Sequence, residues 1–176
     1  MQPGFDLRIA TLLKALSETV LPAVDRGNSA AVEQLHLVVG SLKLLREQID
    51  YAHWFEVVDA RSMAALIDRL AAEIDSDASR QAVVTAAEML AIAHRHDVTL
   101  TTVRDANRTL RNAISALAAA SHAAADAGAG KRVQSMILAH SEGQISRERA
   151  FIAATGFDVF PDTLVSIEES LARAEA

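Results

Sequence analysis

Cysteine is absent from this chain of 176 residues, and only three prolines and seven glycines occur. The lack of cysteine excludes disulfide bonds, thiolate metal sites and cysteine nucleophiles. No apolar run approaches the ~20 residues that a membrane-spanning helix needs, and the first residues lack the basic and apolar regions of a secretory signal. We therefore expect a cytoplasmic protein with no membrane association.

Charge and motifs exclude further classes of protein. A net charge of −6 argues against a nucleic-acid surface, because such binding depends on neutralising phosphates with basic side chains. The sequence contains no glycine-rich phosphate loop, no G-x-S-x-G elbow and no dinucleotide-binding fingerprint. We predict no catalytic residue and no cofactor, and the sequence favours a protein that is not an enzyme.

What the chain does have is alanine, at 35 positions, within a hydrophobic content of 51%. Alanine is the best helix former, and no stretch shows the alternation of a strand beyond a few residues. The length suits one core. We predict an all-α fold with no sheet: a single domain over residues 1–176, built as a helical bundle of six to eight helices.

Residues 29–74 carry the strongest helical pattern. At ~100° per residue, ten apolar residues fall within about 60° of one line. His53 and Glu56 fall on the same line, where a buried polar group without a partner costs roughly 1–3 kcal/mol. The ten apolar residues are Leu35, Val38, Leu42, Leu45, Ile49, Ala60, Met63, Ile67, Leu70 and Ile74.

Whether this stretch is one helix decides how His53 and Glu56 are placed. No glycine or proline occurs between Gly40 and Gly128, yet one helix would be ~70 Å long against a domain width of roughly 40 Å. We therefore expect a break near residues 51–59, with Asp59 or Ser62 as the new N-cap and both polar side chains in solvent. A continuous helix would instead bury both.

Further along the chain, residues 76–79 form a clear turn and cap cluster, and residues 141–144 have the pattern of a capping box that starts a new helix. Phe151, Phe157 and Phe160 cluster within ten positions. We expect them to form a hydrophobic plug over one end of the bundle.

Two pairs of residues have the spacing of carboxylate-bridged metal sites. Glu33 and His36, and likewise Asp50 and His53, are three positions apart, so each pair projects from one helical face. The two pairs lie ~25 Å apart along the helix, and Glu33 is on the polar side. We predict no metal site.

Three arginines, Arg104, Arg108 and Arg111, line one helical face. They could clamp a phosphate or carboxylate, since the guanidinium fork suits both. The simpler interpretation is a solvated face paired locally with Asp105.

Residues 51–56 contain the only tyrosine and the only tryptophan of the chain. Tyr51, Trp54 and Val58 point away from the apolar line, which indicates a second packing partner: another helix or another subunit. Together with Phe55 they are the apolar area from which we predict a homodimer. A ligand pocket is the alternative, and our candidate ligand-binding residues are Tyr51, His53, Trp54, Glu56, Arg104 and Arg108.

Three short motifs carry a resemblance to known proteins. Val20-Leu21-Pro22 follows an amphipathic helix, Asp50 ends a leucine-rich helix, and Ala65-Leu66 follows. Over its first 75 residues the chain resembles small all-helical bacterial proteins of unknown function, encoded near acyl-CoA dehydrogenases and phosphotransferase-like proteins. The resemblance implies an accessory role in acyl-CoA metabolism. Arg61-Ser62 stands where that group has Glu-Asn, so no functional residue transfers.

The leading hypothesis is a non-enzymatic accessory or interaction protein that self-associates as a homodimer. Another protein is a further possible partner, and nucleic acid and membrane are not. The alternative is a bundle that binds a small ligand, either acyl-CoA-related or a metal, in a pocket near His53 and Glu56.

Overall fold

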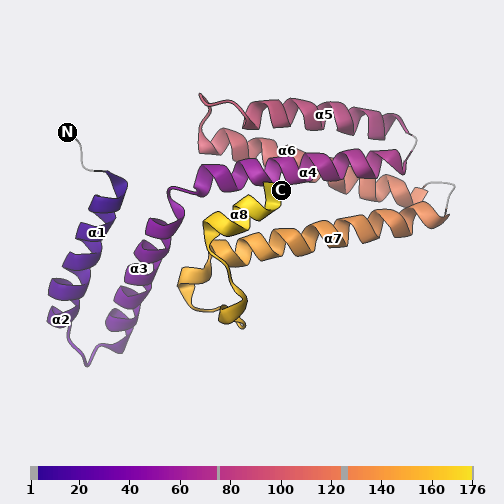
Figure 1. Ribbon diagram of the computed structural model, residues 1–176. Coiled ribbons are helices and arrows are strands. Elements are labelled where there is room, and N and C mark those ends of the chain that lie inside the picture. Colours follow the sequence, from indigo (N-terminus) through magenta and orange to yellow (C-terminus); the bar gives the residue numbers. More distant parts are fainter. Residues whose placement is uncertain (1–3, 75, 124–126, 176) are drawn as a thin grey trace. The chain divides into compact units, whose positions relative to one another are not determined.

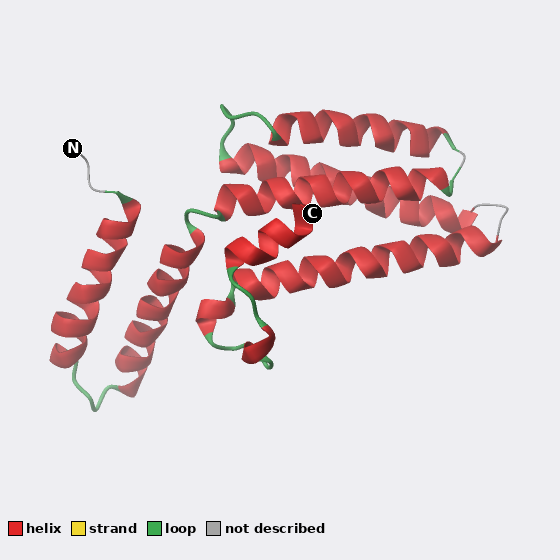
Figure 2. Ribbon diagram, in the orientation of Figure 1, coloured by secondary structure: helices red, strands yellow, loops and turns green. Residues whose placement is uncertain are grey.

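The computed structural model of the chain describes residues 4–74, 76–123 and 127–175. Helices and their connecting turns make up these residues, and no strand occurs among them (Figure 2). Seven α-helices of nine residues or more are present in the described ranges. The prediction of an all-α helical fold is confirmed.

The chain groups into two compact units. The first comprises Met1–Tyr51 and Arg149–Ile167, and the second Ala52–Glu148 and Glu168–Ala176. The single domain stays a prediction. No helix in the described ranges is long and apolar enough to span a membrane.

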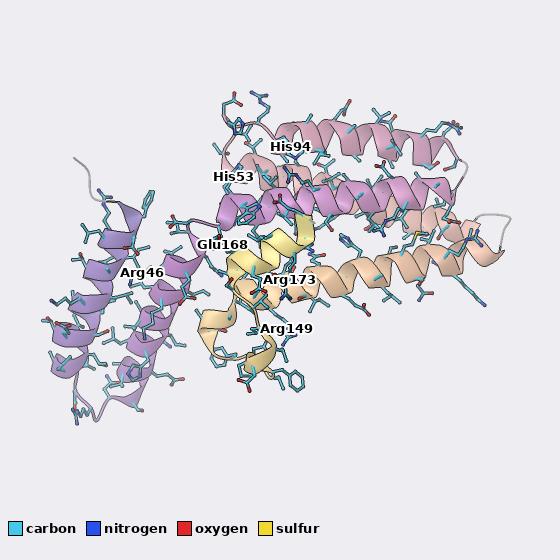
Figure 3. All side chains as sticks on the ribbon, in the orientation of Figure 1. Arg46, His53, His94, Arg149, Glu168 and Arg173 are labelled. Carbon is cyan, nitrogen blue, oxygen red and sulfur yellow. The ribbon has the colours of Figure 1, made fainter. Side chains whose placement is uncertain are left out.

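The first unit contains a helical hairpin. Helix α1 (Phe5–Ala15) continues through a π-helical turn (Leu16–Val20) into the short α2 (Leu21–Ala23), and the chain then reverses into α3 (Ser29–Gln48) (Figure 1). The Asn28 side chain caps α3 by accepting a hydrogen bond from the Ala31 N–H at 3.1 Å. Arg46 on α3 pairs with Asp6 on α1 at 2.6 Å, which ties the two helices together (Figure 3).

The first unit also includes two 3-10 turns, Ala153–Thr155 and Pro161–Thr163. The side-chain amide of Gln48, at the end of α3, donates to the Phe151 carbonyl at 2.7 Å. This bond joins the hairpin to the chain that follows α7.

The second unit holds the main core. Its helices are α4 (Ala52–Ala72), α5 (Asp77–Ala93), α6 (Leu100–Ala123), most of α7 (Ala127–Phe151) and α8 (Ile167–Glu175). Helices α4, α5 and α6 contact one another, as small alanine side chains between them allow. The predicted turn before α5 is confirmed, because Ser76 and Ser79 cap each other's backbone N–H at 3.1 and 3.2 Å. The fully buried core residues include Ala60, Leu66, Ile67, Leu70, Val103, Leu110 and Leu117.

The long pattern over residues 29–74 is interrupted, as predicted. Helix α3 ends at Gln48 and α4 begins at Ala52, so the break lies at the very start of the predicted window. The predicted N-caps are wrong, since Asp59 and Ser62 lie inside α4. Asp59 is buried because its carboxylate meets arginines from other helices.

Two other expectations are wrong. The new helix at Ser141 does not exist, because α7 runs unbroken through it and the Ser141 hydroxyl donates to the Ile137 carbonyl one turn back. The phenylalanine plug is also absent. Phe157 and Phe160 are 85% and 65% exposed, and Phe151 alone of the three is half-buried.

Candidate functional site

A row of polar side chains runs along α4 in the second unit. Glu56, Asp59 and Ser62 are spaced three positions apart, so they lie on one side of the helix. Their partners come from α6 and α7. We call this row and its partners the polar seam.

At the first position of the seam, the Glu56 carboxylate binds two groups of α6. Arg104 Nε donates to Oε1 and Asn107 Nδ2 donates to Oε2, both at 2.8 Å. Asn107 Nδ2 also lies 2.9 Å from the Glu56 carbonyl oxygen. The Glu56 side chain is only 13% exposed, and both of its oxygens accept hydrogen bonds from protein donors. The expectation that Glu56 lies in solvent is therefore wrong, although the helix does break before it.

At the second position, Asp59 forms the most deeply buried ion pair of the described residues. Arg147 Nη2 on α7 donates to Asp59 Oδ1 at 2.9 Å, and the two side chains are 3% and 7% exposed. Arg111 Nη2 on α6 reaches Oδ2 at 3.4 Å. Asp59 therefore joins three helices through charge-assisted bonds.

At the third position, the Ser62 hydroxyl lies 3.2 Å from His140 Nδ1 on α7. Burial lowers the pKa of His140 below its ordinary value of 6.5, and the positive charges of Arg147 and Arg69 lower it further, while Asp59 opposes them. Neutral imidazole can accept the Ser62 proton or donate its own.

The seam does not have the geometry of a Ser-His-Asp triad. Asp59 binds arginines with both of its oxygens, so it does not orient His140 as the acid of a Ser-His-Asp triad would. No group of three or more His, Asp or Glu residues in the described ranges is placed to hold a metal ion. The arrangement holds α4, α6 and α7 together.

The six predicted ligand-binding residues do not all lie together in the structure. It brings Glu56 and Arg104 together, but Arg108 pairs with Asp105 at 2.8 Å on the surface of α6, as the simpler interpretation of the arginine row predicts. His53 is exposed on the first turn of α4 (Figure 3). Tyr51 lies in the turn before α4, and it and Trp54 are half-buried.

Sequence reasoning missed Asp59, Asn107, His140 and Arg147. For Asp59 and Asn107 a signal exists. Glu56, Asp59 and Ser62 recur every three residues, and Arg104, Asn107 and Arg111 recur after three and four residues on α6. Each set therefore forms a polar row on one side of its helix, and two such rows of opposite charge indicate helices that face each other. Arg147 gives no local signal of its burial.

The predicted dimer patch is not available as an exposed surface. Val58 is 1% exposed and belongs to the interior of the second unit. Tyr51, Trp54 and Phe55 are half-buried and have partners within the chain. The aromatic residues of this stretch therefore serve packing inside the chain.

A large apolar surface does occur in the first unit, on the hairpin. Ile9 is the buried residue of α1 and Val39 that of α3, whereas α4 alone buries nine residues. Six large hydrophobic residues of α1 and α3 are between 46% and 68% exposed. They are Phe5, Leu7, Leu12, Leu37, Val38 and Leu45.

The loop of residues 157–160 is a second apolar surface of this unit. Gly156 precedes it with φ of 72°, a conformation that suits glycine. Arg149 donates two hydrogen bonds of 2.8 Å to Asp158, whose Oδ1 also accepts from the Phe160 N–H at 2.8 Å. These bonds lower the pKa of Asp158 to about 2. The loop thus holds Phe157 and Val159 outward, at 85% and 80% exposed.

A cavity of about 290 Å³ lies between α3 and the chain after α7. Leu37, Leu44 and Phe157 supply apolar walls, and Glu33 and His36 lie at its polar side. The same two polar residues line a wider depression of about 630 Å³ beside Pro22 and Arg26.

Comparison with known proteins returns no match: no protein-family model, no curated protein and no solved structure matches this chain.

Proposed function

We propose that this chain is a non-enzymatic interaction protein that self-associates through the hairpin of α1 and α3. The observation that supports the proposal is the contrast between the two units. The second unit buries a core typical of a finished domain, whereas the hairpin buries Ile9 and Val39 and leaves six large hydrophobic side chains in solvent.

The physical reason is that two helices form only one layer. An amphipathic helix has to bury its apolar stripe against another element, and stable domains use at least two layers for this. Contiguous apolar patches beyond a few hundred Å² are rare on monomers and usually mark association sites. A second hairpin would supply the missing layer.

The polar seam supports a role other than catalysis. Glu56, Asp59 and their arginine partners neutralise each other, and an ion-pair network of this kind is a structural device more often than a reactive one. An accessory role, in which the second unit is a rigid body and the hairpin makes contacts, agrees with both features.

The test is the mass of the protein in solution. Sedimentation equilibrium from about 1 to 100 μM should give a species of twice 18.8 kDa at the upper concentrations. A mass of one chain over the whole range would overturn the proposal.

A second candidate function is binding of a small apolar ligand, and the cavity on α3 favours it. Ligand sites are concave and mostly apolar with a few polar groups, a description that fits Leu37, Leu44 and Phe157 beside Glu33 and His36. Dodecanoate is a suitable probe. A rise in melting temperature that is lost in Gly40→Leu, which would fill the cavity wall, supports this function, and no rise in the wild type removes it.

A further inference from the structure

We infer that the partner of the hairpin is the hairpin of a second copy, and that the two form a four-helix bundle around Phe5, Leu12, Val38 and Leu45. This inference rests on the proposed self-association and specifies the surface that carries it.

Helical geometry gives the positions of the four residues on the hairpin. Phe5 and Leu12 are seven residues apart on α1, as Val38 and Leu45 are on α3, so each pair forms one line along its helix. At ~100° per residue, the α1 pair lies ~40–60° to one side of the buried Ile9, and the α3 pair ~100–120° in the same sense from Val39.

The two lines lie on the same face of the hairpin. Helices α1 and α3 run in opposite directions (Figure 1), so equal senses of rotation about the two axes lead to the same side of the layer. Asp6, which pairs with Arg46, lies ~60° to the other side of Ile9. Arg46 lies only ~20° from Val39, so the ion pair sits between the two helices and leaves both apolar lines free.

The area is that of a dimer interface. Phe5, Leu12, Val38 and Leu45 are 68%, 52%, 47% and 46% exposed, in that order. Together they offer roughly 400 Å² of apolar side-chain surface, since a whole aromatic side chain offers about 150–250 Å². A standard interface buries ~800 Å² per partner, of which about 60% is apolar. The four residues therefore supply most of the apolar part.

The surroundings of this face suit a second copy. Ala15 flanks it on α1, Thr19 in the π-helical turn that follows, and Gln34 and Ser41 on α3. All four are uncharged. Arg8, ~100° from Ile9 in the same sense, is the charged residue of α1 on this face. A two-fold pairing brings the same patch of both copies together, and a patch with so little charge keeps like-charge repulsion small. Stacking two antiparallel hairpins gives the four-helix bundle arrangement.

The experiment compares single substitutions on the two sides of the hairpin by sedimentation equilibrium of the full chain. Leu12→Glu and Val38→Glu should each weaken dimerisation by on the order of 100-fold or more, because the interface would contain two buried carboxylates. Leu7→Glu is the matched control. Leu7 is 60% exposed, but it lies ~160° from Ile9 and should leave the dimer intact.

The outcomes separate the inference from the proposal beneath it. A dimer that persists in Leu12→Glu, Val38→Glu and Leu45→Glu contradicts this interface while self-association stands. A wild-type monomer removes both. Circular dichroism checks that helix content is kept, and if a glutamate variant unfolds, Val38→Ser replaces it with the same expected direction.

Discussion

Asp59 and Arg147 are 88 positions apart in the chain, yet Arg147 Nη2 donates to Asp59 Oδ1 at 2.9 Å inside the second unit. Both side chains are almost inaccessible to solvent. A buried pair contributes little compared with an apolar pair of equal shape, but removing one member leaves the other as an uncompensated charge.

Asp59→Asn should be strongly destabilising. The substitution keeps the shape of the side chain but leaves Arg147 buried without its countercharge, so we expect a loss of about 3–5 kcal/mol. Urea unfolding measures the loss. Asp105→Asn is the control, because Asp105 pairs with Arg108 at the surface and should cost less than ~1 kcal/mol. Equal losses for the two variants would show that Asp59 is not buried as described.

Glu56→Gln should cost roughly 1–3 kcal/mol, the effect of a mispaired, mostly buried polar group. The glutamine amide keeps one oxygen that can accept from Asn107. Its N–H₂ group then faces the N–H of Arg104, and Arg104 loses the negative charge with which it pairs. His53→Gln, one turn earlier and exposed, should cost under ~0.5 kcal/mol. A double-mutant cycle with Arg104→Met should show coupling, whereas a cycle with His53→Gln should show none. Coupling to His53 in place of Arg104 would contradict the structure.

The protein should become less stable as the pH is lowered, because of His140. The pKa of His140 is lower in the folded protein than its ordinary 6.5, so below about pH 6.5 the unfolded chain binds the proton more readily. The free energy of unfolding is therefore greater above this range and decreases as the pH falls toward the folded pKa. His140→Gln should flatten this part of the profile relative to wild type. The exposed His96→Gln should not, and identical profiles for wild type and His140→Gln would refute the prediction.

The carboxyl group of Asp158 should titrate near pH 2 because Arg149 and the Phe160 N–H bind its charged form. Arg149→Met removes two of these bonds and should raise the pKa toward the ordinary 3.8. Carbon-detected NMR of the carboxyl resonance measures both values. Arg111→Met, which changes the other unit, should leave the midpoint unchanged. Because the pKa of Asp158 is lowered in the folded protein, this pair contributes fully to the free energy of unfolding above about pH 4. The contribution is lost as the pH falls to about 2.

The sequence predicts the fold class well because its signals are local. The alanine content indicates helices, the length of residues 29–74 against the width of a domain indicates a break, and Ser76 marks a helix start. All three are confirmed in the described residues. The position of the break could not be predicted, since Asp59 has the side chain of an N-cap and its true partner comes from 88 positions later.

The hairpin shows a different limit of what the sequence can predict. An apolar stripe at helical spacing indicates that a face will be covered, but the spacing is the same whether the cover comes from the chain or from a partner. Leu45 and Ile49 belong to one line in the sequence, yet Leu45 is 46% exposed and Ile49 is half-buried. Likewise, Phe157 and Phe160 cluster as a plug would, and they line an exposed loop.

The alanines between α4 and α6 have a consequence for how these helices are aligned. Alanine and leucine recur along both helices, so sliding one helix along the other by a turn of ~5.4 Å would again place apolar side chains against apolar side chains. The same slide would separate Glu56 from Arg104 and Asp59 from Arg111. In the second unit, therefore, apolar contacts hold the helices against each other, and the charged rungs select which of several similar alignments is adopted.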